Sequence, residues 1–233
     1  SEEIKTLSIQ LVVYPMLHAS YHAGARSEFI DSTMPKSFVR DVLFHDGKIL
    51  LCGDRLKVEL LKMANILLEF IPERFQELGK DIVDFCMSLL KSEDALCKSW
   101  AYLVLCRHVC TMKASSKLIL QIYGALIRSH QPEGKEIIRA ALDLLIPAMG
   151  KQLSKPDWRK AIEFTNRIMF EEVNSIPQLA HIWRTAVSHA DTYYDNRHQL
   201  VRYMINSLTR LGLPPNSPSE NRLLSVSVVE LVI

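Results

Sequence analysis

The stretch that decides the fold is "LILQIYGALIRSHQPEGKEIIRAALDLLIPAMGKQLSKPDW", from Leu118 to Trp158. Two runs of apolar residues at helical spacing are joined by the short polar link "SHQPEGKE", and a second link, "LSKPDW", leads into another helix. Pro132 and Pro156 stand at the start of the helices that follow, where a missing N–H is tolerated. Links this short connect antiparallel neighbours, so the stretch predicts helical hairpins.

The same spacing continues on both sides of this stretch. Helix starts are expected near eight positions: Gly79, Ser92, Ser115, Glu133, Pro156, Ser175, Asn196 and Ser217. Alternate starts are separated by 36, 41 and 40 residues in one set and by 41, 42 and 42 in the other. A helix pair recurring at about 40 residues matches HEAT or armadillo repeats and exceeds the tetratricopeptide repeat of about 34.

Strand alternation with hairpin turns is nearly absent from the sequence. We therefore predict an all-α fold, an α-solenoid of HEAT-like antiparallel helix pairs. The links are too brief to separate domains, so residues 1–233 are expected to form one continuous helical repeat segment without an internal boundary.

Two long helices are expected before the regular pairs begin, with a short helix between them from Ser37 to Phe44. Residues from Ile4 to His22 read as a helix with a break or kink just before Pro15. A longer helix follows Asp54 and ends before Pro72. Its apolar stripe at i, i+3, i+4 and i+7 spacing consists of Leu56, Leu60, Leu61, Ala64, Leu67, Leu68 and Ile71.

The last residues, "NSPSENRLLSVSVVELVI", read as a well-signalled helix that is apolar along its length. Ser217 and Glu220 form a Ser-x-x-Glu capping box at its start, with Pro218 at the first helical position. A terminal repeat of a solenoid needs a polar outer face, and this helix has none. We therefore expect a piece of a much larger chain, whose adjacent repeats cover the apolar faces at both ends.

Composition excludes several classes of protein. Apolar residues make up 48% and charged residues 23%, which is typical of a folded globular chain and not of a disordered one. A net charge of +2 lacks the basic excess of a dedicated nucleic-acid binder, and no apolar run is long enough to span a membrane. The five cysteines lack C-x-x-C spacing and read as reduced core thiols.

Motifs that carry chemistry are absent. There is no nucleophile elbow, no phosphate-binding loop, no dinucleotide fingerprint and no kinase signature. His18 and His22 share a helix face, but the zinc-protease motif needs a Glu where Ala19 stands, so ordinary surface or packing histidines are favoured over metal ligands. On a helix His108 points away from Cys106, so core thiols are favoured there too. We expect no catalytic residue, cofactor or metal.

Two basic sets are candidates for contact with a partner, which would be a protein. Arg159, Lys160 and Arg167 lie on the helix expected to start near Pro156. Arg197 and Arg202 lie on the helix expected to start near Asn196. Each can meet an acidic peptide, but acidic residues are interleaved, so solvated helix faces explain them equally well.

The second half of the chain resembles the TRRAP family, the transformation/transcription domain-associated proteins. The likeness is clearest in "FEEVNSIPQLAHI", in "YYDNRHQLV", and in "RLGLPP" followed by "ENRLLSVSVVELVI". It covers Leu118 to Ile233 well and is looser before, where "VVYPMLHASYHAG" is similar to a family helix that contains proline. Many surface positions differ, as in a divergent member.

The resemblance implies a very large helical-repeat scaffold related to phosphatidylinositol-3-kinase-like kinases, with a kinase-like domain far downstream that lacks catalytic residues. It implies a nuclear, non-enzymatic subunit of SAGA-type and MYST-type histone acetyltransferase complexes that receives transcriptional activators. Two alternatives stay open from the residues alone. One is another HEAT scaffold, such as a nuclear-transport receptor or a phosphatase-type scaffold, and the other is an all-α enzyme.

Overall fold

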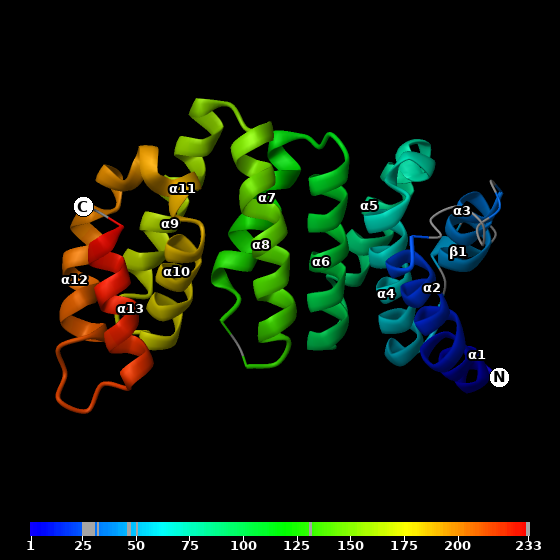
Figure 1. The fold of residues 1–233 in the computed structure, drawn as a ribbon, viewed down its shortest axis with the longest axis horizontal. Coiled ribbons are helices and arrows are strands. Elements are labelled where there is room, and N and C mark those ends of the chain that lie inside the picture. Colours follow the sequence, from blue (N-terminus) through cyan, green and yellow to red (C-terminus); the bar gives the residue numbers. More distant parts are fainter. Residues whose placement is uncertain (25–30, 32, 46–47, 50, 131, 232–233) are drawn as a thin grey trace. The chain divides into compact units, whose positions relative to one another are not determined.

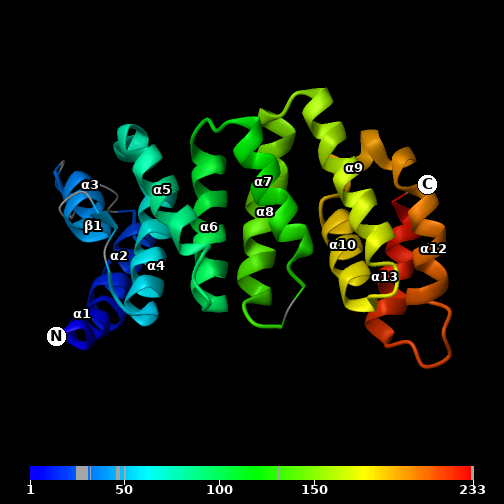
Figure 2. The same cartoon turned by 180° about the vertical axis from the view of Figure 1, so that it is seen from behind.

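The structure is a computed structural model that describes residues 1–24, 31, 33–45, 48–49, 51–130 and 132–231. Its regular elements in these residues are helices, apart from one pair of two-residue strands (Figures 1 and 2). The predicted all-α class is confirmed. The chain packs as two compact units: residues 1–113 with 136–141, and residues 114–135 with 142–233. The prediction of one continuous array over residues 1–233 stays a prediction.

The first unit contains most of the N-terminal elements. They are α1 (Glu2–Ser8), the π-helical η1 (Ile9–Val13), α2 (Tyr14–His22), α3 (Met34–Ser37), the π-helical η2 (Phe38–Leu43), β1 (Phe44–His45), β2 (Lys48–Ile49), α4 (Asp54–Phe70), the 3₁₀-helical η3 (Pro72–Leu78), α5 (Gly79–Leu89) and α6 (Ala95–Thr111). The two strands pair antiparallel, with Phe44 opposite Ile49. Residues 136–141 of α8 (Lys135–Gln152) also belong to this unit.

Helix α4 lies at the centre of the first unit and packs against α1, α2 and α6. All seven residues of its predicted apolar stripe are buried, and Leu61, Leu67 and Leu68 are fully so. A stacked ring pair, Tyr21 on Phe70 at 4.6 Å, joins α2 to α4. The helical period of the sequence therefore predicted the face that forms this core.

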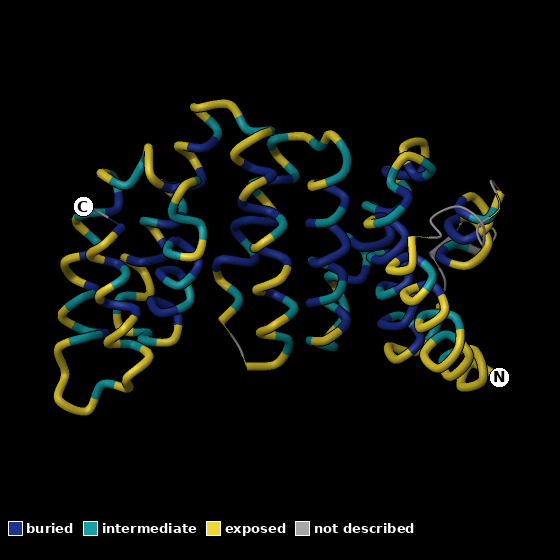
Figure 3. Tube along the Cα trace, in the orientation of Figure 1, coloured by how far each residue is buried: buried dark blue, intermediate teal, exposed yellow. Residues whose placement is uncertain are grey.

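The chain does not break before Pro15, and the alternative expectation, a kink there, stays a prediction. Residues 2–22 are helical throughout, and the wide π turn of η1 ends at Val13, two residues before Pro15, with Tyr14 in the right-handed helical region. Pro15 has no N–H to donate to the carbonyl of Leu11, and a wider turn accommodates that missing bond. Figure 3 shows α1 exposed over most of its length, and none of its residues is buried.

The second unit contains the regular helix pairs of the C-terminal half. They are α7 (Ser116–Arg128), the part of α8 from Leu142 onward, α9 (Lys155–Glu171), α10 (Ile176–Ser188), α11 (Ala190–Tyr193), the 3₁₀-helical η4 (Tyr194–Gln199), α12 (Val201–Leu211) and α13 (Ser219–Glu230). Within this unit α7 packs on α9, and α13 packs on both α10 and α12. Its largest fully buried side chains are Trp183, Tyr123 and Tyr193.

Serine caps start three helices of this unit where the sequence predicted them. Ser115, Ser154 and Ser175 each accept a hydrogen bond from the backbone N–H three residues later, at 3.3, 3.3 and 3.4 Å. Pro156 and Pro177 occupy the first turns that follow two of these caps. Such a cap contributes about 1 kcal/mol, so the local sequence fixes where these helices begin.

The last helix begins at Ser219, close to its predicted start near Ser217, but its predicted capping box is wrong, and so is the start predicted near Asn196. The Ser217 hydroxyl donates to the carbonyl of Leu211 instead of capping α13, which has Pro218 as its cap residue. The helix expected near Asn196 begins only at Val201, because a 3₁₀ helix occupies the preceding residues.

The interval of about 40 residues survives these shifts. Helices α5, α7, α9 and α12 begin 37, 39 and 46 residues apart, and helices α6, α8, α10 and α13 begin 40, 41 and 43 residues apart. This is the HEAT spacing that the sequence predicted.

Polar side chains of α10 also tie it to the end of α7. Gln178 Nε2 donates to the carbonyl of Ile127 at 2.6 Å, and His181 Nε2 lies 3.0 Å from the carbonyl of Leu126. Because a carbonyl only accepts, the proton of neutral His181 is on Nε2. The carbonyl of Leu126, which also accepts from the backbone N–H of Ser129 at 3.0 Å, and the carbonyl of Ile127 thus both have partners on the neighbouring helix.

Candidate functional site

All five basic residues singled out from the sequence lie in the second unit. Arg159, Lys160 and Arg167 are on α9, Arg197 is in η4, and Arg202 is on α12. Arg197 is half-buried and the other four are exposed. The structure thus places these charges on three elements of one compact unit.

Two of these basic side chains are engaged locally. Lys160 Nζ lies 2.8 Å from Asp157 Oδ1, and the bond to Lys160 is the main reason that the pKa of Asp157 is lowered. Arg197 donates to the carbonyl of Tyr194 at 2.7 Å and covers the ring of that tyrosine at 3.5 Å. Both residues therefore fit the solvated-face interpretation.

The other three arginines have no such partner. Arg159, Arg167 and Arg202 form no ion pair and no side-chain hydrogen bond with any residue that the structure describes. Exposed guanidinium groups of this kind keep all their donors available to a carboxylate. These three are the better candidates for contact with a partner.

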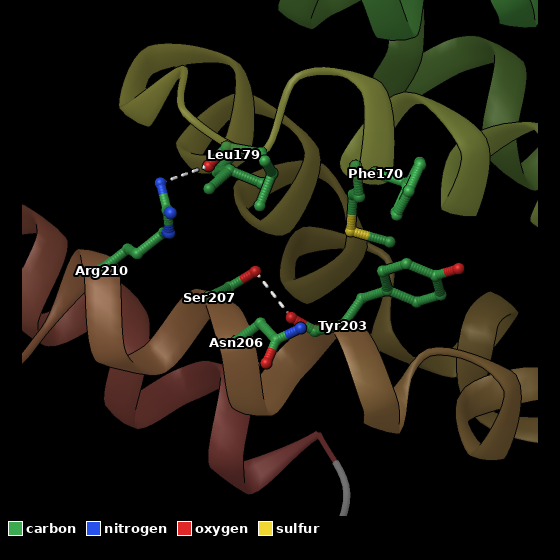
Figure 4. A pocket seen from close by; sticks show the side chains of 8 residues that line it. Phe170, Leu179, Tyr203, Asn206, Ser207 and Arg210 are labelled. Carbon is green, nitrogen blue, oxygen red and sulfur yellow. Dashed lines mark hydrogen bonds between the residues drawn. The ribbon is translucent and has the colours of Figure 1, made fainter.

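A shallow pocket lies between α9, α10 and α12, and the empty space of about 310 Å³ among its lining atoms includes open solvent. Figure 4 shows Tyr203, Asn206, Ser207 and Arg210 along α12, opposite Phe170 and Leu179. The pocket is lined by Met169, Phe170, Val173, Leu179, Tyr203, Asn206, Ser207 and Arg210. One side is thus apolar and the other carries hydroxyl, amide and guanidinium groups.

Arg210 fixes one end of this pocket. Its guanidinium donates to the carbonyl of Val173 at 2.8 Å and to Oδ1 of Asn174 at 2.9 Å. Phe170 stands at the opposite side with 73% of its surface exposed. An aromatic ring held this far out of the core forms an apolar rim that a partner side chain can cover.

None of the five predicted basic residues lines the pocket, but two flank it. Arg167 is three residues before Phe170 on α9, and Arg202 is four residues before Asn206 on α12. Residues at these spacings share a helix face. We define Arg167, Arg202 and the lining residues of the pocket as the α9–α12 surface.

The candidate cluster of Cys106, His108 and Cys110 does not come together. Cys110 is exposed while Cys106 and His108 are buried, and no cluster of three or more His, Cys, Asp or Glu side chains in the described ranges can hold a metal ion. Burial raises the pKa of Cys97 to about 11, and burial also raises the pKa of Cys86 and Cys106. These thiols stay protonated at neutral pH and are poor nucleophiles.

A family model decides the relationship of this chain to known proteins. The model described as "Tra1 HEAT repeat ring region" matches residues 1–233. The chain belongs to the Tra1 family.

Tra1-family relatives match over nearly the whole chain. A probable transcription-associated protein 1 of Dictyostelium discoideum is 28% identical over 98% of this chain, and the transformation/transcription domain-associated protein of Homo sapiens is 27% identical over all of it. The "SAGA complex/NuA4 acetyltransferase complex subunit TRA1" of Saccharomyces cerevisiae is 29% identical over 77% of it. The chain spans 5 to 6% of the length of these three relatives.

No solved structure matches the chain. Among the described residues, no helix combines the length and apolar character that crossing a bilayer requires.

Sequence reasoning did not single out the pocket in this Tra1 repeat region. Phe170 and Tyr203 stand in ordinary helical sequence, and only the packing of α12 against α9 brings them together. One signal was present: Phe170 directly precedes Glu171 and Glu172, so a large aromatic residue falls on the polar side of an amphipathic helix.

Proposed function

We propose that this chain is a non-catalytic scaffold segment of a nuclear transcription coactivator, on which activators and subunits of histone acetyltransferase complexes dock. The observation that carries the proposal is the match of the Tra1 HEAT repeat ring region to residues 1–233. The yeast relative, whose name makes it a subunit of the SAGA and NuA4 acetyltransferase complexes, supports it further. The resemblance of the second half of the chain to TRRAP proteins agrees with it.

The α9–α12 surface is the docking site within this proposal. A partner helix with an apolar residue in the pocket and acidic residues one turn away would meet Arg167 and Arg202. Burying one Leu or Phe side chain contributes about 1.5–3 kcal/mol, and each rim ion pair adds up to about 1 kcal/mol. An acidic, hydrophobic activation segment has this chemistry and folds on binding.

The alternatives have less support. A nuclear-transport receptor or phosphatase-type scaffold would share the helix pairs, but the full-length family match is to Tra1. An all-α enzyme would need titratable groups converging in a pocket. The described pocket contains only one ionisable cation, Arg210, together with the Tyr203 hydroxyl.

The test uses the full-length protein carrying the double substitution Arg167→Glu and Arg202→Glu. Binding of a fluorescent acidic activation peptide is measured by anisotropy, and complex assembly is measured by quantitative mass spectrometry of the purified acetyltransferase complexes. Reversing two rim charges should weaken peptide binding by about 5- to 30-fold, since each pair contributes up to about 1 kcal/mol and repulsion adds to its loss.

The matched control reverses the charges of two exposed lysines elsewhere in the same unit, with the substitutions Lys117→Glu and Lys151→Glu. It changes the net charge by the same amount as the double arginine variant. The control should bind the peptide like the wild type. Equal weakening by both double variants would show a nonspecific charge effect. Unchanged peptide binding and unchanged subunit ratios in the Arg167/Arg202 variant would refute docking at this surface.

A further inference from the structure

Two exposed histidines of α2, in the first unit, face each other. His22 Nε2 lies 3.2 Å from His18 Nε2, and the ring centroids are 4.3 Å apart. The two residues are four apart on a helix, so their side chains project from one face. We propose that His18 and His22 form a two-histidine binding site for a divalent ion of the zinc type.

The spacing of the two nitrogens suits a metal ion. Imidazole nitrogens bind Zn²⁺ at about 2.0–2.1 Å, so two of them on a tetrahedral ion lie about 3.3–3.4 Å apart. The observed 3.2 Å is within about 0.2 Å of that separation. Coordination of one ion therefore needs the two rings to turn until both Nε2 lone pairs point at it, while the two nitrogens stay at nearly their present separation.

Aromatic neighbours orient both rings. The Tyr14 ring centroid lies 6.1 Å from that of His18, and the Phe70 ring stands edge-on to His22 at 5.7 Å. Because both imidazoles lie in a row between Tyr14 and Phe70, less rotamer freedom is lost when an ion binds. Such pre-orientation raises affinity without any new contact.

The proton balance of binding is simple. In the present arrangement one neutral ring donates its Nε2–H to the other Nε2. When an ion binds, that proton moves to Nδ1 of the same ring, both Nε2 lone pairs coordinate the ion, and no net proton is released. Coordination by neutral imidazole is the usual state of histidine ligands.

The site binds an ion but carries no catalytic apparatus. Ala19 stands where zinc proteases have a glutamate base, and the chain supplies two ligands where structural zinc sites have four. Two tetrahedral positions therefore remain for water or for a donor side chain of a partner protein. Binding by the chain alone should accordingly be modest, and a partner that contributes further ligands would strengthen it.

The test titrates ZnCl₂ into the 233-residue chain by calorimetry, with His18→Gln and His22→Gln as variants. Holding the second imidazole next to the first makes its coordination intramolecular, so either substitution should weaken binding at least about tenfold. Exposed histidines elsewhere, His130 and His198, provide matched controls as His130→Gln and His198→Gln, which should leave the affinity unchanged.

A second measurement does not depend on the variants. Electron paramagnetic resonance of bound Cu²⁺, which histidine ligands hold more tightly than Zn²⁺, should report two coordinating nitrogens in the wild type and one in His22→Gln. Zinc binding that survives both substitutions would overturn the proposal. A wild-type copper spectrum with fewer than two coordinating nitrogens would also overturn it. The absence of any heat of binding at 1 mM ZnCl₂ would do the same, because a dissociation constant above about 1 mM is too weak for a specific site.

Discussion

The hydroxyl of Tyr123 on α7 lies 2.9 Å from the hydroxyl of Tyr193 on α11, and both side chains are buried. Tyr123 also lies 2.6 Å from Thr165 Oγ1, which donates its own proton to the carbonyl of Ala161. Each hydroxyl has one proton, so Tyr123 donates to Thr165 and Tyr193 donates to Tyr123. The three residues thus form a directed chain inside the second unit.

This direction predicts unequal effects of removing the two hydroxyls. Tyr123→Phe leaves the Tyr193 hydroxyl as a buried donor without an acceptor, which should lower the free energy of unfolding by about 1–3 kcal/mol. Tyr193→Phe removes the donor to the Tyr123 hydroxyl, which still donates its own proton to Thr165. The free energy of unfolding should therefore fall by only about 0.5–1.5 kcal/mol. Urea denaturation of both variants measures the difference, and a larger loss for Tyr193→Phe would show that the chain runs the other way.

The tie between α10 and α7 predicts a specific role for Gln178. The substitution Gln178→Met keeps the side-chain volume but removes the donor to the carbonyl of Ile127, so unfolding should become easier by about 1–3 kcal/mol. Gln121 on α7 is exposed, and Gln121→Met should change the free energy of unfolding by at most about 0.5 kcal/mol. Thermal denaturation of both variants makes the comparison, and equal effects would contradict a role for the hydrogen bond.

His108 on α6 predicts how stability depends on pH. Burial lowers the pKa of His108, and its Nδ1 has no hydrogen-bond partner among the described residues. The unfolded chain therefore binds a proton more readily than the folded chain. The contribution of neutral His108 to the free energy of unfolding is fully present above the ordinary histidine pKa of about 6.5. It is lost as the pH falls below that value, with a slope of at most about 1.4 kcal/mol per pH unit for this one group.

The variant His108→Leu removes this group and should flatten that part of the pH profile. Its stability at pH 7.5 should change little, because an unsatisfied polar atom is removed along with some packing. His130→Gln changes an exposed histidine and serves as the control. Urea denaturation between pH 7.5 and 5 gives the profile, and an unchanged slope in His108→Leu would assign the loss to other groups.

Exposed apolar residues on α13 predict self-association of the isolated chain. Leu223 is 68% exposed and Val226 is 57% exposed, three residues apart on one face. Sedimentation velocity at rising concentration should show oligomers, which the double substitution Leu223→Glu with Val226→Glu should reduce several-fold by removing apolar area and adding charge. The control Lys117→Gln with Arg55→Gln changes the net charge by the same amount, keeps these apolar side chains and should still associate.

The sequence predicted the helices best where local signals decide them. Ser154 with Pro156 and Ser175 with Pro177 specify helix starts through their own backbone geometry, and the structure begins helices there. Ser217 carries the same signal, yet its hydroxyl bonds to the carbonyl of Leu211 on α12. A cap of that kind competes with a tertiary partner that the local pattern does not contain.

The candidate site was less accessible to sequence reasoning than the fold. Periodicity placed Arg167 and Arg202 on helix surfaces, but it gave no sign that α9 and α12 enclose a pocket between them. Likewise the helical spacing put His18 and His22 on one face, while their approach to 3.2 Å depends on side-chain rotamers. Pairing of helices and choice of rotamer are set by packing across the fold, which a single sequence does not display.

The two bonds from α10 to the carbonyls at the end of α7 determine more than stability. Apolar helix faces can shift along one another, because one apolar contact replaces another. Gln178 and His181, in contrast, each form a hydrogen bond with one particular carbonyl oxygen. A slip of one residue moves a donor by about 1.5 Å along the axis and breaks both bonds together. The axial register of these two helices is therefore set by two polar atoms, and the core side chains settle around that alignment.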